Sequence, residues 1–442
     1  MRIQLSEHFN YKKLLRFTLP SIVMMIFTSI YGVVDGVFVS NFVGTTPFAA
    51  INLIMPVYMV LAAVGFMVGT GGSALVSKTL GEGDAKRANE IFSLLVYASA
   101  IFGTIISALV FVLLEPISVL LGAEGEMLDA CVLYGRILLP FMTVYILQNE
   151  FQSFLVAAEK PKLGLWITVA SGCTNILLDA LFVAVFPFGL AGAAVATAIS
   201  QLVGGVIPLF YFIFSKKTVL KLGKTGFDGK ALIATCANGA SEMMANLSLS
   251  VVNILYNFRL MELVGEAGIA AYGVIMYVNF IFMAVFFGYS VGSAPIISYH
   301  YGAGGEAELK SLRKKSLVIV AVSALVMTAL AELLASPLSR LFVGGDEDLF
   351  LMTKRGFMLY SLSFLVMGFN VFASSFFTAL NNGGVSAIIS FSRTFLFQII
   401  PIFVLPIWLG LDGIWLSVVA AELCSIVVTV FFFVTQRSRY GY

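Results

Sequence analysis

Long apolar stretches, separated by short polar segments, follow one another along the whole chain. A helix needs about 20 apolar residues to cross the hydrocarbon core of a bilayer. Stretches of at least this length are predicted near residues 15–40, 48–77, 91–115, 130–158, 163–187, 190–215, 231–260, 267–299, 316–337, 355–380, 384–408 and 412–436. The pattern therefore predicts an all-α integral membrane protein with twelve transmembrane helices.

The composition agrees with this prediction and narrows the class of protein. Of the 442 residues, 60% are hydrophobic and 11% are charged, whereas a soluble domain carries about 25% charged residues. The formal net charge is only +2, which argues against a nucleic-acid partner. The two histidines, His8 and His300, are too few for a histidine-based metal or catalytic cluster, and the sequence has no nucleophile–base motif. We therefore expect a protein that is not an enzyme.

The distribution of lysine and arginine indicates how the chain crosses the membrane. With the N-terminus placed in the cytoplasm, most of the 26 basic residues fall in cytoplasmic segments, as the positive-inside rule requires. Segments on the other side are acidic instead, for example at Asp346, Glu347 and Asp348. We therefore predict a multi-pass protein of the plasma membrane with both termini in the cytoplasm.

The second half of the chain repeats the first. The loop LGEGDAKRANE after the second span matches YGAGGEAELKS after the eighth, which aligns Gly81 with Gly302 at an offset of 221 residues. Two further matches, GLAG with GLDG and FQSFLVAA with FASSFFTA, keep the same offset. We therefore predict two lobes of six helices, 1–214 and 231–442, joined by a cytoplasmic connector at 215–230.

The even number of helices in each copy decides how the copies are related. Both copies must enter the membrane from the same side, so they are parallel repeats related by an axis along the membrane normal. Such folds place the substrate between their two halves. The architecture predicts a transporter that works by alternating access.

Acidic residues inside the predicted helices are candidate functional residues, because a charge in the membrane is costly. They are Asp35, Glu150, Asp179, Glu242 and Glu422. The sequence leaves the roles of Glu150, Glu242 and Glu422 open.

Two of these acids have a polar neighbour one helical turn away. Residues four apart share a helix face, which pairs Asn175 with Asp179 and Tyr31 with Asp35. Both carboxylates fall in the outer halves of helices that run from inside to outside, so we expect one shared pocket. Two carboxylates in a dry pocket cannot both ionise cheaply, and the same oxygens can hold a hard cation such as sodium. The alternative is that Asn175 and Asp179 only hydrogen-bond a neighbouring helix.

Pro20 lies about four turns before Asp35 in the first span. A proline inside a helix removes one backbone hydrogen bond and clashes with the carbonyl four residues back. We expect a hinge there, which bends the first helix when Asp35 is protonated or binds sodium.

The chain resembles the multidrug and toxic compound extrusion (MATE) family, whose members are cation-coupled exporters built of two six-helix lobes. The resemblance rests on the twelve spans, the duplication, the first span TLPSIVMMIFTSIYGVVDGVFV and the loop LGEGDAKRANEIF. In one branch of the family, an Asp of the first helix and an Asn and an Asp of the fifth form a cation site. These residues correspond to Asp35, Asn175 and Asp179. The resemblance implies a cation site there, and no metal site beyond sodium bound at these residues.

The same resemblance implies a substrate cavity around the cation site. The residues that match the family's cavity are Tyr31, Tyr134, Gln152, Thr197 and Glu242, the last through an acid on the seventh helix of another branch. Leu396 and Ile400 occupy the positions in the second lobe that are equivalent to Asn175 and Asp179. The second lobe therefore lacks a copy of the site, which favours ion coupling by the first lobe.

The expected function is secondary active antiport, in which a drug or another organic, cationic compound leaves in exchange for H+ or Na+. The expected partners are this substrate, the coupling ion and membrane lipid, with no other cofactor and no obligate protein partner. The alternative is a lipid-linked oligosaccharide flippase of the related superfamily. A flippase for anionic lipids should line its cavity with several basic residues, and here Arg393 alone lies deep in a span. The substrate, the coupling ion and the oligomeric state stay open.

Overall fold

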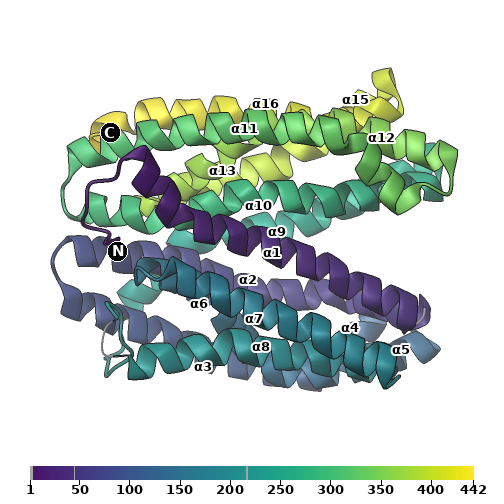
Figure 1. The fold of residues 1–442 in the computed structure, drawn as a ribbon, viewed down its shortest axis with the longest axis horizontal. Helices are drawn as coiled ribbons and strands as arrows, with labels where there is room; N and C mark the ends of the chain where they lie inside the picture. The colour runs from purple at the N-terminus through teal and green to yellow at the C-terminus, as the bar shows by residue number, and fades with distance from the viewer. Residues whose placement is uncertain (1–2, 44, 216–217) are drawn as a thin grey trace.

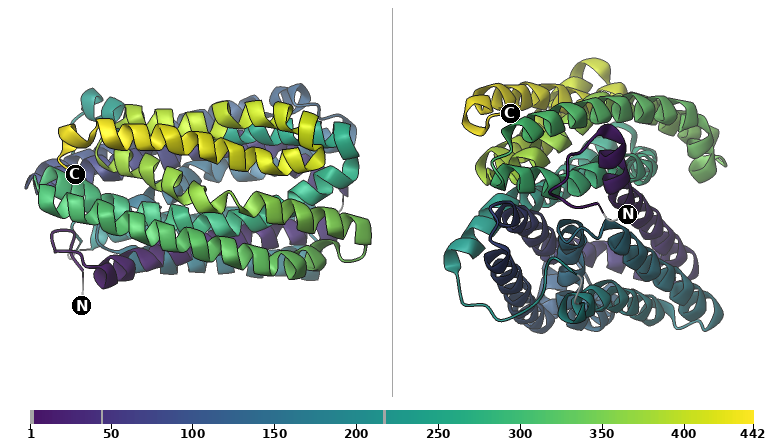
Figure 2. Two further views of the ribbon diagram at one scale, coloured as in Figure 1. Left: turned by 90° about the horizontal axis from the view of Figure 1, so that it is seen from above. Right: turned by 60° about the vertical axis from the view of Figure 1, so that its left-hand side comes forward.

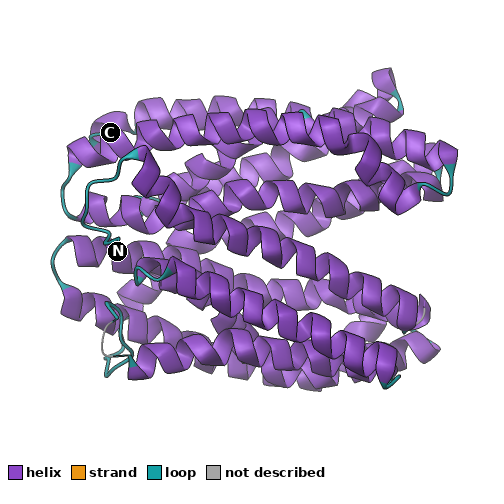
Figure 3. Ribbon diagram, in the orientation of Figure 1, coloured by secondary structure: helices purple, strands orange, loops and turns teal. Residues whose placement is uncertain are grey.

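Long helices make up nearly all of the molecule, and no strand occurs among the residues that the structure describes (Figure 3). The computed structural model describes residues 3–43, 45–215 and 218–442, apart from the side chains of residues 35–41, 45 and 48. The helices run side by side along the long axis, and both termini lie at the same end (Figure 1). A helix satisfies its backbone hydrogen bonds internally, which is what a chain crossing hydrocarbon requires.

The first half of the chain forms α1 (Tyr11–Phe42), α2 (Thr45–Gly81), α3 (Ala85–Val112), α4 (Leu114–Leu120), α5 (Gly125–Leu138), the 3-10 turn η1 (Leu139–Phe141), α6 (Met142–Ala157), α7 (Pro161–Asp179), the π-helical segment η2 (Ala180–Val185) and α8 (Gly189–Phe214). The second half forms α9 (Gly229–Val264), α10 (Glu266–Gly302), α11 (Glu306–Val343), α12 (Glu347–Ser361), α13 (Phe364–Ala379), α14 (Gly383–Phe391), the π-helical segment η3 (Ser392–Leu396), α15 (Phe397–Leu409), α16 (Leu411–Thr435) and α17 (Arg437–Tyr440). Figure 2 shows the helices of the two halves gathered in two groups.

The transmembrane architecture expected from hydropathy is confirmed. Eleven helices of the described chain are long and apolar enough to cross a membrane, and the bent pair α12–α13 makes a twelfth. The ninth span differs most from its prediction, because the helix runs over Glu306–Val343 and not only over 316–337. Its first turns carry Lys310 and Lys314 on exposed positions, so the helix continues beyond the apolar stretch.

The fourth transmembrane span of each half is interrupted, whereas the sequence predicted a continuous helix there. In the first half, Pro140 lies in η1 between α5 and α6, where its missing N–H breaks the helical ladder. The equivalent residue in the second half is Ser361, at the end of α12, and the chain bends there by 50°. The Ser361 hydroxyl shares its one proton between the Met358 carbonyl oxygen (2.9 Å) and Glu332 Oε1 of α11 (2.9 Å). A hydroxyl bonded back to its own helix favours such a bend.

Glycines let helices of the two halves touch. α1 packs along α10, and α2 packs along both α9 and α10. A Cβ on Gly81 would lie 2.0 Å from the Tyr299 carbonyl oxygen, and a Cβ on Gly302 would lie 2.0 Å from the Lys78 carbonyl oxygen. Close backbone contact through small residues is a main source of helix association in membranes. The two glycines matched as repeats in the sequence therefore lie where α2 and α10 meet.

We predict that Gly302→Ala destabilises the protein. A methyl group at residue 302 has no room beside the Lys78 carbonyl, and overpacking costs about 1–3 kcal/mol. The expected result is a lower thermal unfolding midpoint of the purified protein in detergent.

Gly273→Ala is the matched control, because Gly273 lies in the same helix with no atom within 4 Å of an added Cβ. Alanine is the better helix former, so this variant should unfold at the wild-type temperature or above it. Equal losses in the two variants would contradict the close contact.

Candidate functional site

α7 presents a polar buried face at its C-terminal end. Asn175 and Asp179 are 3% and 0% exposed, and they continue a buried row that includes Thr168 and Ser171. The Ser171 hydroxyl donates to the Ser200 carbonyl of α8 (2.7 Å), which holds the two helices together. Asn175 and Asp179 therefore share one buried face, as their spacing predicts.

Side chains from α1 and α8 complete this part of the site. Gly172 leaves space for Tyr31 of α1, since an added Cβ would lie 2.8 Å from the tyrosine ring. The Asn175 amide nitrogen donates to the Thr197 hydroxyl of α8 at 3.5 Å. The structure thus brings Tyr31, Asn175 and Thr197 together, with Asp179 one turn further along α7.

The helix changes its geometry directly after Asp179. α7 ends at this residue, and the six residues of η2 that follow form a π-helical segment. π-helical segments are rare and are frequent at functional sites. No residue pattern in the sequence had indicated this change.

Asp35 lies in α1, but its side chain is outside the described residues. The predicted approach of Asp35 to Asp179 therefore stays a prediction. Among the described side chains, no group of three His, Cys, Asp or Glu is placed to hold a metal ion.

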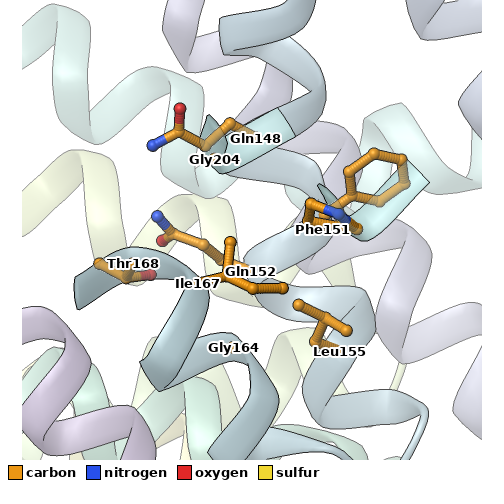
Figure 4. Close-up of a pocket in the computed structure, with 9 residues that line it drawn as sticks. Gln148, Phe151, Gln152, Leu155, Gly164, Ile167, Thr168 and Gly204 are labelled. Atoms are coloured by element: carbon orange, nitrogen blue, oxygen red, sulfur yellow. The ribbon is translucent and has the colours of Figure 1, made fainter. Parts of the chain in front are cut away.

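Tyr134 and Gln152 lie on neighbouring helices of the same half. Tyr134 of α5 is buried, and its ring meets Tyr58 edge-on at 6.4 Å. Gln152 of α6 lines a pocket between α6, α7 and α8, whose lining includes Gln148 and Thr168 (Figure 4). Thr168 lies about two turns before Asn175 on α7. The pocket that Gln152 lines is therefore about two turns closer to the N-terminal end of α7 than the Asn175 amide is.

Glu242 is not part of this group. It lies half-buried on α9, in the other half of the molecule. The preceding residue, Ser241, accepts a hydrogen bond from Ser390 of α14 through its carbonyl (3.2 Å). The predicted cavity residues thus divide between the two halves, with Glu242 alone in the second.

A buried ion pair in the second half was missed by sequence reasoning. Arg393 in η3 donates from Nε to Glu422 Oε1 of α16 (2.8 Å), and the side chains are 7% and 0% exposed. The Asn370 amide donates to the other carboxylate oxygen (2.7 Å), and Thr429 donates to the Asn370 carbonyl oxygen (2.8 Å). The sequence did contain a signal for this pair, because it places two opposite charges deep in consecutive predicted spans. The pair neutralises Glu422, whose role the sequence had left open.

Glu150 is the second fully buried acid whose role the sequence left open. It lies on α6 with 0% exposure, and the Ser99 hydroxyl of α3 is its polar neighbour. Gly69 of α2 packs directly on its backbone, with 3.1 Å between an added Cβ and the Glu150 Cα. Glu150 thus faces the interior of the first-half bundle.

Comparison with known proteins shows similarity to one family along both halves of the chain. The model of the MatE family matches residues 20–181 and 243–404, one segment in each half. The multidrug export protein MepA of Staphylococcus haemolyticus (strain JCSC1435) is 25% identical over 431 residues, which cover 97% of this chain and 94% of that protein.

Two solved structures share the fold. One is described as the outward-facing conformation of a multidrug resistance MATE family transporter of the MOP superfamily, with a TM-score of 0.93, 21% identity and coverage of 99% of this chain and 97% of that one. The other, a MATE crystal structure in complex with MaL6, has a TM-score of 0.92, 22% identity and the same coverage.

We predict that Glu422→Gln strongly destabilises the protein. Removing one partner leaves a buried, uncompensated Arg393, which costs about 3–5 kcal/mol. A lower thermal unfolding midpoint in detergent is the expected result.

The double variant Arg393→Met/Glu422→Leu is the control, because it removes both charges and keeps apolar volume. A buried pair replaced by apolar groups is often neutral or stabilising, so the double variant should unfold closer to the wild type than Glu422→Gln does. A double variant at least as unstable as Glu422→Gln would contradict the charge argument.

Proposed function

This chain belongs to the MATE family of multidrug efflux transporters, and from that premise we propose that it exports organic, cationic compounds in exchange for H+ or Na+. One observation carries the proposal. Asp179 is fully buried at a helix discontinuity, one turn after Asn175 on the same buried face of α7. A carboxylate in such a place is stable when a proton or a metal cation neutralises it.

The neighbours of Asp179 suit a site that takes up and releases one positive charge. Since the Asn175 nitrogen donates to Thr197, the Asn175 carbonyl oxygen is left as an acceptor. Oxygen ligands of this kind suit a hard cation. We infer that Asp179, Asn175 and Asp35 form the cation site, as in the branch of the family with a first-lobe site. The coupling ion and membrane lipid are then the partners besides the substrate.

The surrounding side chains favour a cationic substrate. Tyr31 and Tyr134 provide aromatic rings, to which organic cations are attracted. Gln152 and Thr197 provide groups for hydrogen bonds. Protonation or sodium binding at Asp179 removes the negative charge that holds a cationic substrate, so loading the site with the coupling ion promotes substrate release.

We place both termini in the cytoplasm and the protein in the plasma membrane, with two lobes at 1–214 and 231–442. In this orientation the contacts of Gly81 with Tyr299 and of Gly302 with Lys78 close the cytoplasmic side. Export then requires that α2 and α10 separate there when the transporter faces inward. The solved structure described as outward-facing matches this chain with a TM-score of 0.93, which supports an outward-facing state with its cytoplasmic side closed.

The flippase alternative is weakened by the ion pair in the second half. Arg393 is the deep basic residue that an anionic lipid-linked substrate would need, and it is neutralised by Glu422. A neutral pair offers such a substrate no net positive charge.

We also propose that α1 bends at Pro20 when the site is loaded. α1 is one helix with Pro20 inside it, and it packs on α7 through Tyr31 and Gly172. An ionised Asp35 favours a wet, open cavity, whereas a neutral one can approach Asp179. Only a free-energy difference between the two shapes can drive such a switch, and the charge at Asp35 provides it.

Asp35→Asn and Asp179→Asn should each fold and insert but lose gradient-driven export, because an amide cannot change its charge during the cycle. The assay is efflux of a fluorescent organic cation from proteoliposomes under an imposed pH or sodium gradient. Each variant is expected to show the rate of protein-free vesicles. Wild-type rates in either variant would refute the first-lobe site.

Glu242→Gln is the matched control, since it makes the same chemical change to a half-buried acid of the other half. It should keep most of the wild-type rate. If it abolishes export while Asp35→Asn does not, ion coupling belongs to the second lobe.

The hinge is tested by the distance between spin labels at Phe42 and Phe186, which are exposed at the ends of α1 and η2. In a background without the native cysteines, we expect the distance to change between low and high pH, or with sodium. The change should disappear in Asp35→Asn. A wild-type distance that ignores both pH and sodium would exclude the bend.

A further inference from the structure

The connector between α8 and α9 is attached to α3 along its described part. Asn89, Ser93 and Tyr97 of α3 are spaced four apart, so they form one face of the helix. Asn89 accepts from the Lys221 backbone N–H (2.5 Å), Ser93 accepts from the Gly223 N–H (3.0 Å), and Tyr97 donates to the Gly223 carbonyl (3.0 Å). This row of side chains satisfies backbone groups that have no partner in a helix or strand.

Two further contacts fix the connector on the first-half bundle. The Leu220 side chain is fully buried among apolar residues of that bundle. Thr225 donates to the Glu90 carbonyl of α3 (2.8 Å). Residues 218–225 are therefore a docked element and not a free linker.

The α3 residues that hold the connector, Asn89, Ser93 and Tyr97, place it at the level where the hydrocarbon begins. α3 carries charges at Lys86, Arg87 and Glu90, and its apolar stretch starts at Ile91. The connector meets α3 from Asn89 to Tyr97, on both sides of this boundary. Non-helical backbone at this depth is tolerated when its polar groups are satisfied, as they are here.

The outer surface of the connector is basic, with one large apolar side chain. Lys221, Lys224 and Lys230 are exposed and form no ion pair among the described residues. Phe227 is 87% exposed. An aromatic ring flanked by lysines at a membrane boundary is the arrangement that anchors proteins in the headgroup region.

The acidic residue of this segment does not cancel these charges. Asp228 caps α9 by accepting from the backbone N–H groups of Lys230 and Ala231, and it forms an ion pair with Arg87. The Ala231 N–H and the Arg87 guanidinium hold the pKa of Asp228 below its ordinary value. Asp228 is thus ionised and engaged with Arg87, and the three lysines keep their net charge.

We propose that the connector is a binding surface for anionic phospholipids of the adjoining leaflet, with the lysines at the phosphate groups and Phe227 in the acyl boundary. The complementary charge of the headgroups, the depth of the segment and the exposed ring together define this partner. The binding is independent of the export proposed above. It holds the connector, and with it the first half, at a fixed height in the membrane.

The test compares spin-labelled phosphatidylglycerol with spin-labelled phosphatidylcholine around the full-length protein in phosphatidylcholine vesicles. The measured quantity is the ratio of the two lipids immobilised by the protein. Lys221→Gln/Lys224→Gln/Lys230→Gln should lower the preference for phosphatidylglycerol by at least about twofold, because the attraction of a basic segment to anionic headgroups scales with its number of lysines.

The matched control, Lys12→Gln/Lys310→Gln/Lys314→Gln, removes the same charge from exposed positions at the same end of the molecule. It should leave most of the preference intact. Equal losses in the two triple variants, or no loss in the connector variant, would overturn the proposal.

Phe227→Ser gives an independent readout that keeps every lysine. Phosphatidylglycerol should protect the wild-type connector from trypsin at Lys221 and Lys224 in vesicles with this face outward, and Phe227→Ser should reduce that protection. Equal cleavage of the wild type in vesicles with and without phosphatidylglycerol would also overturn the proposal.

Discussion

A charge removed from water must be neutralised, and this constraint organises the interior of the protein. In the second half the chain meets it internally, because Arg393 and Asn370 engage both oxygens of Glu422. In the first half, the buried face of α7 holds Asn175 and Asp179, two residues of the proposed cation site. Under the proposed function, a proton or cation from solution neutralises Asp179 and so links this site to an ion gradient.

The two halves are held together by a different kind of contact. Lipid tails are as apolar as leucine, so helices in a membrane associate through close packing rather than through the hydrophobic effect. Here the backbones of α2 and α10 touch at Gly81 and Gly302, and those of α2 and α9 touch at Gly71 and Gly239. Such contacts depend on fit, contain no ion pair and are lost on a small displacement. They suit an interface that opens and closes during the proposed export cycle.

The connector shows that a polar, lysine-rich composition does not identify the flexible part of this chain. Its lysine-rich composition is typical of a flexible link, yet Leu220 is buried in the first-half bundle and the backbone is bonded to Asn89 and Ser93. The described part of the connector is therefore fixed to the first half. Asp228, at the start of α9, is fixed there too by its ion pair with Arg87 of α3.

The amino-acid sequence by itself determined the number and position of the spans, the repeat at an offset of 221 and the shared face of Asn175 and Asp179. These features depend on local periodicity and on the cost of moving each side chain out of water, and both can be evaluated along the chain. Only the tertiary structure decided that Arg393 neutralises Glu422, that the equivalent glycines Gly81 and Gly302 each pack on the backbone of the facing helix, and that a π-helical segment follows Asp179. Each of these depends on how the helices fit against one another, and hydropathy does not report that fit because the lipid and the helix surfaces are equally apolar.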